Sequence, residues 1–361
     1  MRGDDQHPDG LFSDRRPEER VPADHPVRPI RAMVGVVLRG LSPEFARLYP
    51  QTGRPSIPPE KLRRALLLQL LDSIRSERQL IEQLDSNLRF RWVVGLSMDD
   101  PVWDPTVFTK NRERLRRGDI ARAFFERVLA QAPARQGLSA EHFPVAGTLS
   151  EAWASLKSFK PTAARPAGPP DDPGNPTVNC HGDRRSTATQ AWTPDPEARL
   201  LRKGPGRAAK LSYPGHVRME TRHGLAGDGG VSQATGTAAR ETGLARATHR
   251  PPDATLGGDK SYDTGDFGAG LRALGVTPPV AQNPTHRRSA IDGRTTRPAG
   301  YAVSPRPRKV VEEIFGWVKT VALFRTTRHR GVRRVGWMCV VGLAVYNLVR
   351  IRNLTWQPAT A

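Results

Sequence analysis

The spacing of apolar residues over residues 57–135 predicts a helical unit. Leu62, Ala65 and Leu70 recur at helical intervals after Pro58-Pro59, a pair typical of a helix start. The same spacing predicts further helices over 75–88, 106–115 and 120–131. A small all-α domain is therefore expected over residues 51–135, with Arg and Lys on its outer faces.

The pattern changes at residue 142, where short apolar runs predict strands mixed with helices. In HFPVAGTLSEAW, residues 142–153, the apolar run 143–145 predicts the end of a strand, and Gly147-Thr148 predicts a tight turn before a helix. Ala146 is then expected at the tip of the strand. Further strands are predicted within 208–236, 255–258 and 276–282, and helices over 238–247, 267–274, 309–323 and 335–350.

A strand meander followed by alternating strands and helices predicts a mixed sheet covered by helices, so the chain as a whole is expected to be α+β. The second domain is predicted over 142–352, with a mobile Pro/Gly-rich loop at 161–178. The polar, basic segment 1–50 is predicted to be disordered. The apolar run 335–349 is shorter than the roughly 20 residues that cross a bilayer, which favours a buried helix.

The charge of the chain indicates a polyanionic partner. The 361 residues include 56 Lys and Arg against 36 Asp and Glu, a formal net charge of +20. Nucleic acid is the simplest such partner, and a membrane surface is the rival. No basic amphipathic anchor or lipidation signal is found, so no membrane association is expected. Two distant cysteines, Cys180 and Cys339, form no zinc or disulfide pattern and favour a reducing cytoplasm.

The first candidate for chemistry is LGGDKSYD, residues 256–263. A strand that ends at Gly257-Gly258 would deliver Asp259 at its carboxyl end, where open α/β sheets bind ligands. Lys260 could contact phosphate. The alternative is a turn or helix-capping Asp, which the motif alone does not exclude.

The second candidate is RPRKVVEEIFGWVK, residues 306–319. On a helix Arg308, Glu312 and Lys319 fall within about 40° of one another. A carboxylate between two cations suits a metal ligand beside groups that hold DNA phosphate. An ordinary solvated face with an Arg–Glu pair would show the same spacing.

The third feature is the density of basic residues near the end of the chain. Residues 294–334 contain eleven Lys and Arg but only two acids, Glu312 and Glu313. Such residues neutralise phosphates and supply sequence-independent affinity. Candidate contacts are Arg325, Arg328 and Arg330 here, and Arg75 and Arg78 in the helical domain; each could equally be an ordinary surface residue.

Together these segments resemble the DDE transposases of bacterial insertion sequences, in the branch called insertion-sequence family five. The resemblance covers about residues 50–352. It depends on motifs that occur in order: GRPSIPPEKLRRALLLQLL, SIRSERQLIEQLDSNLRFRWVVGLSMDDPVWDPTVFTKNRERL, GTLSEAWASLKSFKP, DPEARLLRKG, GHVRMETRHGL, QATGTAARE, LGGDKSYDT, LGVTPPVAQN, RRSAIDGRTTR and GYAVSPRPRKVVEEIFGWVKTV.

The resemblance implies an N-terminal helical DNA-binding domain and an RNase H-like catalytic core in which three carboxylates hold two Mg²⁺ (or Mn²⁺) ions. The family's second Asp falls on Asp259. Its Glu falls on Glu312, within an Arg-x3-Glu-x6-Lys signature that is here Arg308, Glu312 and Lys319. The Tyr that commonly precedes this Arg by three residues is replaced by Pro305.

The family's first Asp belongs to an Asp-Gly-Thr motif, which reads Ala146-Gly147-Thr148 in this chain. A metal ligand is therefore expected to be missing. Mg²⁺ requires near-octahedral oxygen ligands, so the two-metal arrangement is expected to fail while Asp259 and Glu312 bind one ion weakly.

The resulting hypothesis is an insertion-sequence transposase that binds terminal inverted repeats and target DNA, with impaired strand cleavage and transfer. Self-association on DNA and a bacterial cytoplasmic, nucleoid-associated location are expected. One alternative is a decayed DNA-binding relic or inhibitor of an active transposase. The other is a nuclease-like enzyme that binds two metals in a different way.

Overall fold

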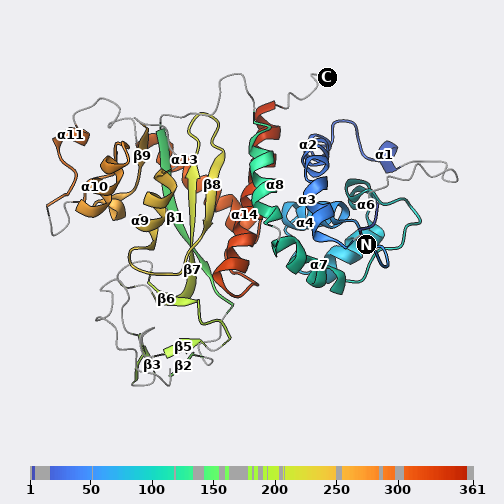
Figure 1. Ribbon diagram of the computed structural model, residues 1–361, viewed down its shortest axis with the longest axis horizontal. Helices are drawn as coiled ribbons and strands as arrows, with labels where there is room; N and C mark the ends of the chain where they lie inside the picture. The colour runs from blue at the N-terminus through green and yellow to red at the C-terminus, as the bar shows by residue number, and fades with distance from the viewer. Residues whose placement is uncertain are drawn as a thin grey trace. The chain divides into compact units, whose positions relative to one another are not determined.

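The chain divides into two compact units (Figure 1). The first comprises residues 1–136, 320–323 and 340–361, and the second comprises 137–319 and 324–339. The predicted second domain, 142–352, is thus not continuous, because its last part belongs to the first unit. The computed structural model describes residues 2–4, 17–50, 52–117, 119–132, 142–153, 159–161, 178–180, 183–185, 190–192, 194–202, 206, 208–248, 254–283, 288–296 and 305–355.

The first unit is built from helices. They are α1 (Pro17–Arg20), α2 (Val27–Gly40), α3 (Ser42–Leu48), α4 (Pro59–Leu71), α5 (Glu77–Ser86), α6 (Leu88–Val94), α7 (Thr106–Arg117) and α8 (Ile120–Leu129). Local signals set several boundaries. The hydroxyl of Ser76 accepts from the backbone N of Gln79 and caps α5, and Gly95, at φ 86°, ends α6. The helices predicted between residues 57 and 131 are confirmed.

The prediction of a disordered segment over residues 1–50 is wrong for residues 17–50. This stretch forms α1, α2 and α3, and α2 buries an apolar stripe that includes Ile30, Val34 and Val37. The stripe has helical spacing, but polar and proline-rich flanks dominate the composition of the segment. Burial of this stripe stabilises a helix that composition alone does not predict.

The second unit is built on a mixed sheet with strand order β6-β7-β1-β9, and β8 pairs with β7. Its strands are β1 (His142–Glu151), β6 (Arg199–Leu201), β7 (Lys210–Met219), β8 (Ala226–Val231) and β9 (Thr255–Gly257). Only the pairing of β1 with β9 is parallel; β7 pairs antiparallel with β1, β6 and β8. Two small two-stranded sheets lie outside this sheet: β2 (Phe159–Pro161) with β5 (Gln190–Trp192), and β3 (Val178–Cys180) with β4 (Asp183–Arg185).

The strand–turn–helix prediction for residues 142–153 is wrong. β1 is one continuous strand of ten residues, and Ala146 lies in its middle rather than at its tip. Gly147 pairs with His216 and Thr148 pairs with Gly215 on β7. This cross-strand pairing holds the Gly-Thr dipeptide extended, which overrides its local preference for a turn.

The helices of the second unit follow their predicted order. They are α9 (Ala238–Ala247), α10 (Gly265–Ala273), α11 (Gly293–Thr296) and α13 (Pro305–Thr320), with a 3₁₀ turn, η3, at Lys260–Tyr262. α13 extends one residue past the limit of this unit at 319. The strand predicted over 276–282 forms only isolated bridges, from Thr277 to Thr255 and from Val280 to Gly258.

The last helix, α14 (Val332–Thr355), is divided between the two units. It is the one described helix long and apolar enough to cross a membrane by length and composition. However, 78% of its most apolar window is buried inside the protein. A buried helix is thus the better description, as the sequence predicted.

His216 on β7 provides a test of the sheet's interior. Its ring is buried, and Nε2 lies 2.7 Å from the hydroxyl of Ser232. Burial and the charge of Arg246 lower the pKa of His216 to about 4. The folded protein therefore keeps this ring neutral, whereas the unfolded chain takes up a proton near pH 6.5.

We expect the free energy of unfolding to fall as the pH drops from 6.5 to 4, by at most about 3 kcal/mol from this residue. The stabilisation that the neutral His216 ring provides is fully present above pH 6.5 and is lost as the pH falls toward 4. His216→Gln should show a shallower decline in urea titrations across the same range. Equal slopes in both proteins would mean that the pKa of His216 is the same in the folded and unfolded states.

Candidate functional site

The register between β1 and β9 brings two predicted site positions together. Phe143 pairs with Leu256 and Pro144 pairs with Gly257. The last recorded pair is Pro144 with Gly257, where β9 ends. Two more residues in the same register would place Ala146 beside Asp259, 113 residues away in sequence, on strands about 4.8 Å apart.

Side-chain alternation puts Ala146 and Asp259 on the same face of the sheet. Val145 and Leu256 belong to an apolar cluster with residues of α9 and α10, so their side chains share the face that these helices cover. The backbone of Asp259 is still extended, at φ −75° and ψ −180°. Alternation therefore directs Ala146 and Asp259 to the opposite face.

The segment that follows α13 lies on this second face. Gly215 pairs with Thr148, whose side chain shares the face of Ala146, and a Cβ at Gly215 would lie 3.0 Å from the ring of Phe324. The backbone N of Phe324 donates to the carbonyl of Val318 in α13, at 3.1 Å. The last turns of α13 are thereby tied to the Ala146 face of the sheet.

Glu312 lies on α13, and its side chain is exposed. The buried residues of the helix are Val311, Ile314, Phe315 and Val318, which form the apolar stripe that the sequence predicted. Glu312 is therefore anchored on the helix that is tied to the face of Ala146 and Asp259. Its proximity to Asp259 stays a prediction.

Asp259 performs the capping role that the sequence analysis left open. Its Oδ1 accepts from the backbone N of Ser261 at 2.8 Å and from the Ser261 hydroxyl, and so caps η3. The residue is exposed. These hydrogen bonds fix Oδ1 and thereby orient the carboxylate at the end of β9. The other oxygen, Oδ2, is not used by the cap and could bind a metal ion.

Two neighbours explain why LGGDKSYD has its sequence. Gly258 leaves no room for a side chain, because a Cβ there would lie 2.9 Å from Cγ of the buried Tyr262. The carboxylate of Asp263 is buried and accepts from the backbone N of Asn283 at 2.6 Å and of Ala290 at 2.9 Å. Asp263 therefore holds neighbouring loops in place.

The predicted phosphate contacts are distributed over several elements. Lys260 is exposed next to Asp259, and Lys319 is half-buried on α13. Arg308 lies within α13, but its side chain is outside the described residues.

The segment of Arg325, Arg328 and Arg330 is anchored elsewhere. The backbone N of Glu151 donates to the carbonyl of Arg325 at 2.9 Å, which ties this segment to the far end of β1. That end is roughly 17 Å along the strand from Ala146. All three arginines are exposed, so they form a basic region distinct from the strand end that carries Asp259.

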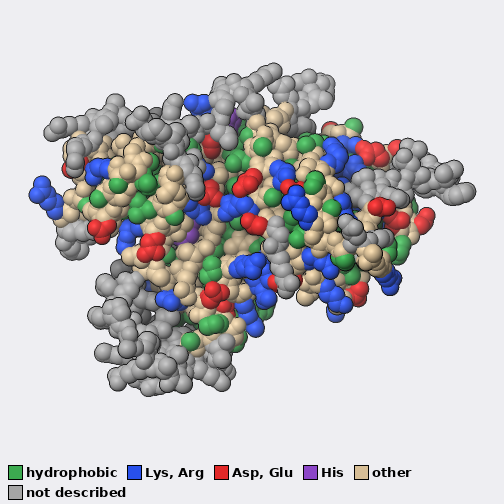
Figure 2. Space-filling view, in the orientation of Figure 1, with side chains coloured by type: hydrophobic (Ala, Val, Ile, Leu, Met, Phe, Trp, Pro, Cys, Tyr) green, Lys and Arg blue, Asp and Glu red, His purple; other side chains and the backbone are tan. Residues whose placement is uncertain are grey.

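In the first unit, Arg75 and Arg78 are both exposed. Arg75 lines a cavity of about 560 Å³ together with Asp72 and Glu82. Asp72 forms an ion pair with Arg89 at 2.6 Å. The two carboxylates make this cavity a poor match for a polyanion. Figure 2 shows Lys and Arg side chains over both units rather than in one patch.

The residues at positions 146 and 259 fit a metal centre incompletely. Asp259 supplies carboxylate oxygen, the ligand type that Mg²⁺ and Mn²⁺ prefer, whereas Ala146 supplies none. Within the described part of the chain, no group of three or more His, Cys, Asp or Glu side chains could hold a metal ion.

Sequence comparison identifies part of the first unit. Residues 15–114 match a family model described as Transposase domain (DUF772), which supports a transposase role. The match includes α1 to α6 and most of α7. No curated protein matches the chain.

Two solved structures show weak overall similarity. One is a piggyBac transposase synaptic complex with hairpin DNA, at a TM-score of 0.41 and 11% identity, covering 96% of this chain and 79% of that chain. The other is a pre-cleavage Mos1 transpososome, at a TM-score of 0.17 and 12% identity; the alignment covers 85% of this chain and 83% of that chain. Both scores are too low to carry an argument about fold or mechanism.

A basic cavity in the first unit, which the sequence did not predict, is lined by Arg28, Arg31, Arg39 and Arg64. The first three belong to α2, within the segment predicted to be disordered. A signal was present, because these arginines recur along one side of α2, next to the buried stripe of Ile30 and Val34.

The packing of Gly258 gives a test of the strand end. Gly258→Ala should destabilise the protein by about 1–3 kcal/mol, because the new methyl group overlaps the buried Tyr262 side chain. Thermal or urea unfolding measures the effect. Gly265→Ala is the matched control, since a Cβ there meets nothing within 4 Å. Equal stability of the two variants would contradict the tight packing behind Asp259.

Proposed function

We propose that this chain is a transposase of the insertion-sequence type that binds DNA but is impaired in strand cleavage and transfer. The observation that supports the proposal is the parallel register of β1 with β9, which, continued by two residues, would set Ala146 next to Asp259. The match of residues 15–114 to a transposase domain supports the same general role.

The impairment follows from the chemistry of the missing group. In the proposed arrangement, Asp259 and Glu312 would hold a divalent cation, which would activate the attacking oxygen and stabilise the leaving oxygen of a phosphodiester. A third carboxylate would screen two neighbouring dications from each other. The methyl group of Ala146 has no oxygen for that role, so we derive no cleavage step through a two-metal centre in this chain.

DNA binding does not depend on this centre. Phosphate contacts are additive and distributed over many Lys and Arg side chains, so loss of one carboxylate leaves them intact. The net charge of +20 and the exposed Arg325, Arg328 and Arg330 support this part of the proposal. The second candidate function, an inhibitor that occupies the ends recognised by an active relative, follows from the same reasoning.

Ala146→Asp tests the proposed centre. We expect this variant to bind Mn²⁺ more tightly than the wild-type protein and to nick DNA at least about tenfold faster, since even disturbance of a metal's outer ligands costs 10–100-fold. The measurements are Mn²⁺ titration by electron paramagnetic resonance and nicking of a supercoiled plasmid that carries the gene with its flanking DNA.

Ala146→Asn is the control, because it has the same size but a weaker, neutral oxygen ligand. It should remain close to wild type in both measurements. Wild-type nicking as fast as that of Ala146→Asp would refute the impairment. If Ala146→Asp gains neither Mn²⁺ affinity nor nicking, the assignment of Ala146, Asp259 and Glu312 to one centre is wrong.

A further inference from the structure

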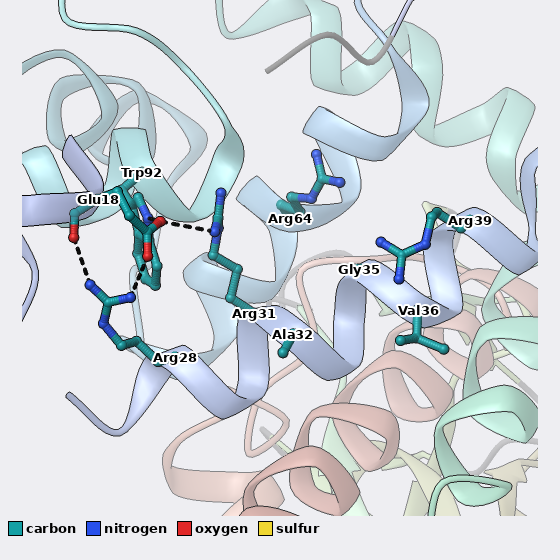
Figure 3. Close-up of a pocket in the computed structure, with 9 residues that line it drawn as sticks. All are labelled: Glu18, Arg28, Arg31, Ala32, Gly35, Val36, Arg39, Arg64 and Trp92. Carbon is teal, nitrogen blue, oxygen red and sulfur yellow. Dashed lines mark hydrogen bonds and ion pairs between the residues drawn. The ribbon is translucent and has the colours of Figure 1, made fainter. Parts of the chain in front are cut away.

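A basic cavity of about 540 Å³ lies in the first unit, and none of the residues assigned to the proposed metal centre lines it (Figure 3). One side of α2 forms much of its wall, and α1, α4 and α6 contribute one residue each. The lining residues are Glu18, Arg28, Arg31, Ala32, Gly35, Val36, Arg39, Arg64 and Trp92. We refer to it as the α2 cavity.

The charge of the α2 cavity selects an anion. Its lining includes four guanidinium groups and one carboxylate, a formal net charge of +3, and the remaining residues are uncharged. Guanidinium groups are always protonated near neutral pH and match the geometry of phosphate oxygens. Concentration of like charge in a concave site raises the local potential and attracts anions.

The arrangement along α2 favours a chain of phosphates over a single one. Arg28, Arg31 and Arg39 lie on the cavity side of the helix, and Arg28 and Arg39 are separated by roughly 16 Å along its axis. Gly35 lies between Arg31 and Arg39 and contributes no side chain, which leaves space there. Successive phosphates of one DNA strand are separated by about 3.4 Å along the duplex axis, so this span matches several of them.

Two of the guanidinium groups pack against Trp92, and that of Arg28 is also fixed by backbone carbonyls, since Nε donates to Pro22 at 2.8 Å and Nη2 donates to Val21 at 2.7 Å. The guanidinium carbons of Arg28 and Arg31 lie 5.0 Å and 4.4 Å from the centre of its ring, and the ring itself is buried. Arg64 is also fixed, since its Nη1 donates to the carbonyl of Val94 at 3.3 Å. Groups that are ordered before binding lose less side-chain entropy when a ligand arrives.

Glu18 occupies part of this site as an internal anion. Its carboxylate pairs with Arg28 and, at 3.3 Å, with Arg31, and it accepts from the indole N–H of Trp92. Desolvation acts to raise the pKa of Glu18, but hydrogen bonds from Trp92 and Arg28 and the charges of Arg28 and Arg31 lower it below its ordinary value. The side chain is still 49% exposed, and α1 is only four residues long.

We propose that the α2 cavity binds the phosphate backbone of duplex DNA and that Glu18 competes with those phosphates for Arg28 and Arg31. The choice of DNA rests on the proposed function, whereas the anion site rests on the geometry alone. The expected contact is independent of base sequence, because guanidinium groups here would contact phosphates rather than base edges.

Gly35 allows a test that leaves every arginine in place. A Cβ at Gly35 would be in ordinary contact, 3.5 Å from Nη1 of Arg39, so a side chain fits without disturbing the helix. Gly35→Glu adds a carboxylate to the cavity, and Gly35→Gln adds the same bulk without charge. The full-length proteins are compared by fluorescence anisotropy with a random-sequence DNA duplex at several NaCl concentrations.

We expect Gly35→Glu to bind the duplex about tenfold more weakly than Gly35→Gln. The slope of the logarithm of the association constant against the logarithm of the NaCl concentration should also be shallower by about one. Glu18→Gln should bind more tightly than wild type, by about threefold or more, because it removes the internal anion while its amide oxygen still accepts from Trp92. Circular dichroism of each variant verifies the helical fold.

Each outcome separates this inference from the proposed function. Equal affinities of Gly35→Glu and Gly35→Gln, with wild-type binding intact, overturn the α2 cavity as a phosphate site and leave the transposase proposal standing. Tighter binding of wild type to an RNA duplex of the same length overturns the choice of DNA. If Glu18→Gln does not gain affinity, the competition is refuted. The cavity results do not depend on nicking, so a failure of Ala146→Asp to restore cleavage does not touch them.

Discussion

The pairing of β1 with strands on both of its sides is the constraint on which the second unit depends. β7 holds residues 145–151 in an extended antiparallel ladder, and β9 joins residues 142–144 from the other side in parallel. A strand paired on both edges cannot slip by one residue without moving its whole apolar set to the other face. Because Val145 and Leu256 must face the cluster beneath α9 and α10, Ala146 and Asp259 must face away from it.

This constraint explains how a buried packing requirement sets the geometry of an exposed site. The apolar side chains fix the register, and Gly258 allows Tyr262 to pack directly behind the strand end. Asp259 is then oriented by capping η3. Packing on the opposite side of the sheet thus sets the position of the Asp259 carboxylate. This position does not depend on whether residue 146 can bind a metal ion.

The two units differ in how well their proposed roles tolerate sequence change. A metal centre requires each ligand at a defined place, so a single methyl group in place of a carboxylate removes much of its function. Phosphate binding is shared by many Lys and Arg side chains, so each substitution lowers the affinity for DNA by only a small step. In the α2 cavity, Trp92 orders two arginines and Glu18 neutralises part of their charge, so the contacts that stabilise the fold would also set the proposed affinity for an anion. A chain that has lost cleavage can therefore keep DNA binding.

The sequence alone determined the helices between residues 57 and 131 and most of the strands and helices after residue 208, because periodicity and capping are local properties. It also singled out Asp259 and Glu312 as candidate carboxylates. It did not determine the conformation of β1, since Gly147-Thr148 has the local chemistry of a turn and only pairing with β7 keeps it extended. It did not reveal α2, because that helix is stabilised by burial of Ile30 and Val34 against the rest of the unit rather than by composition. Only the tertiary structure decided that Ala146 and Asp259 share a face and that the arginines of α2 surround one cavity, because both facts depend on contacts between residues distant in sequence.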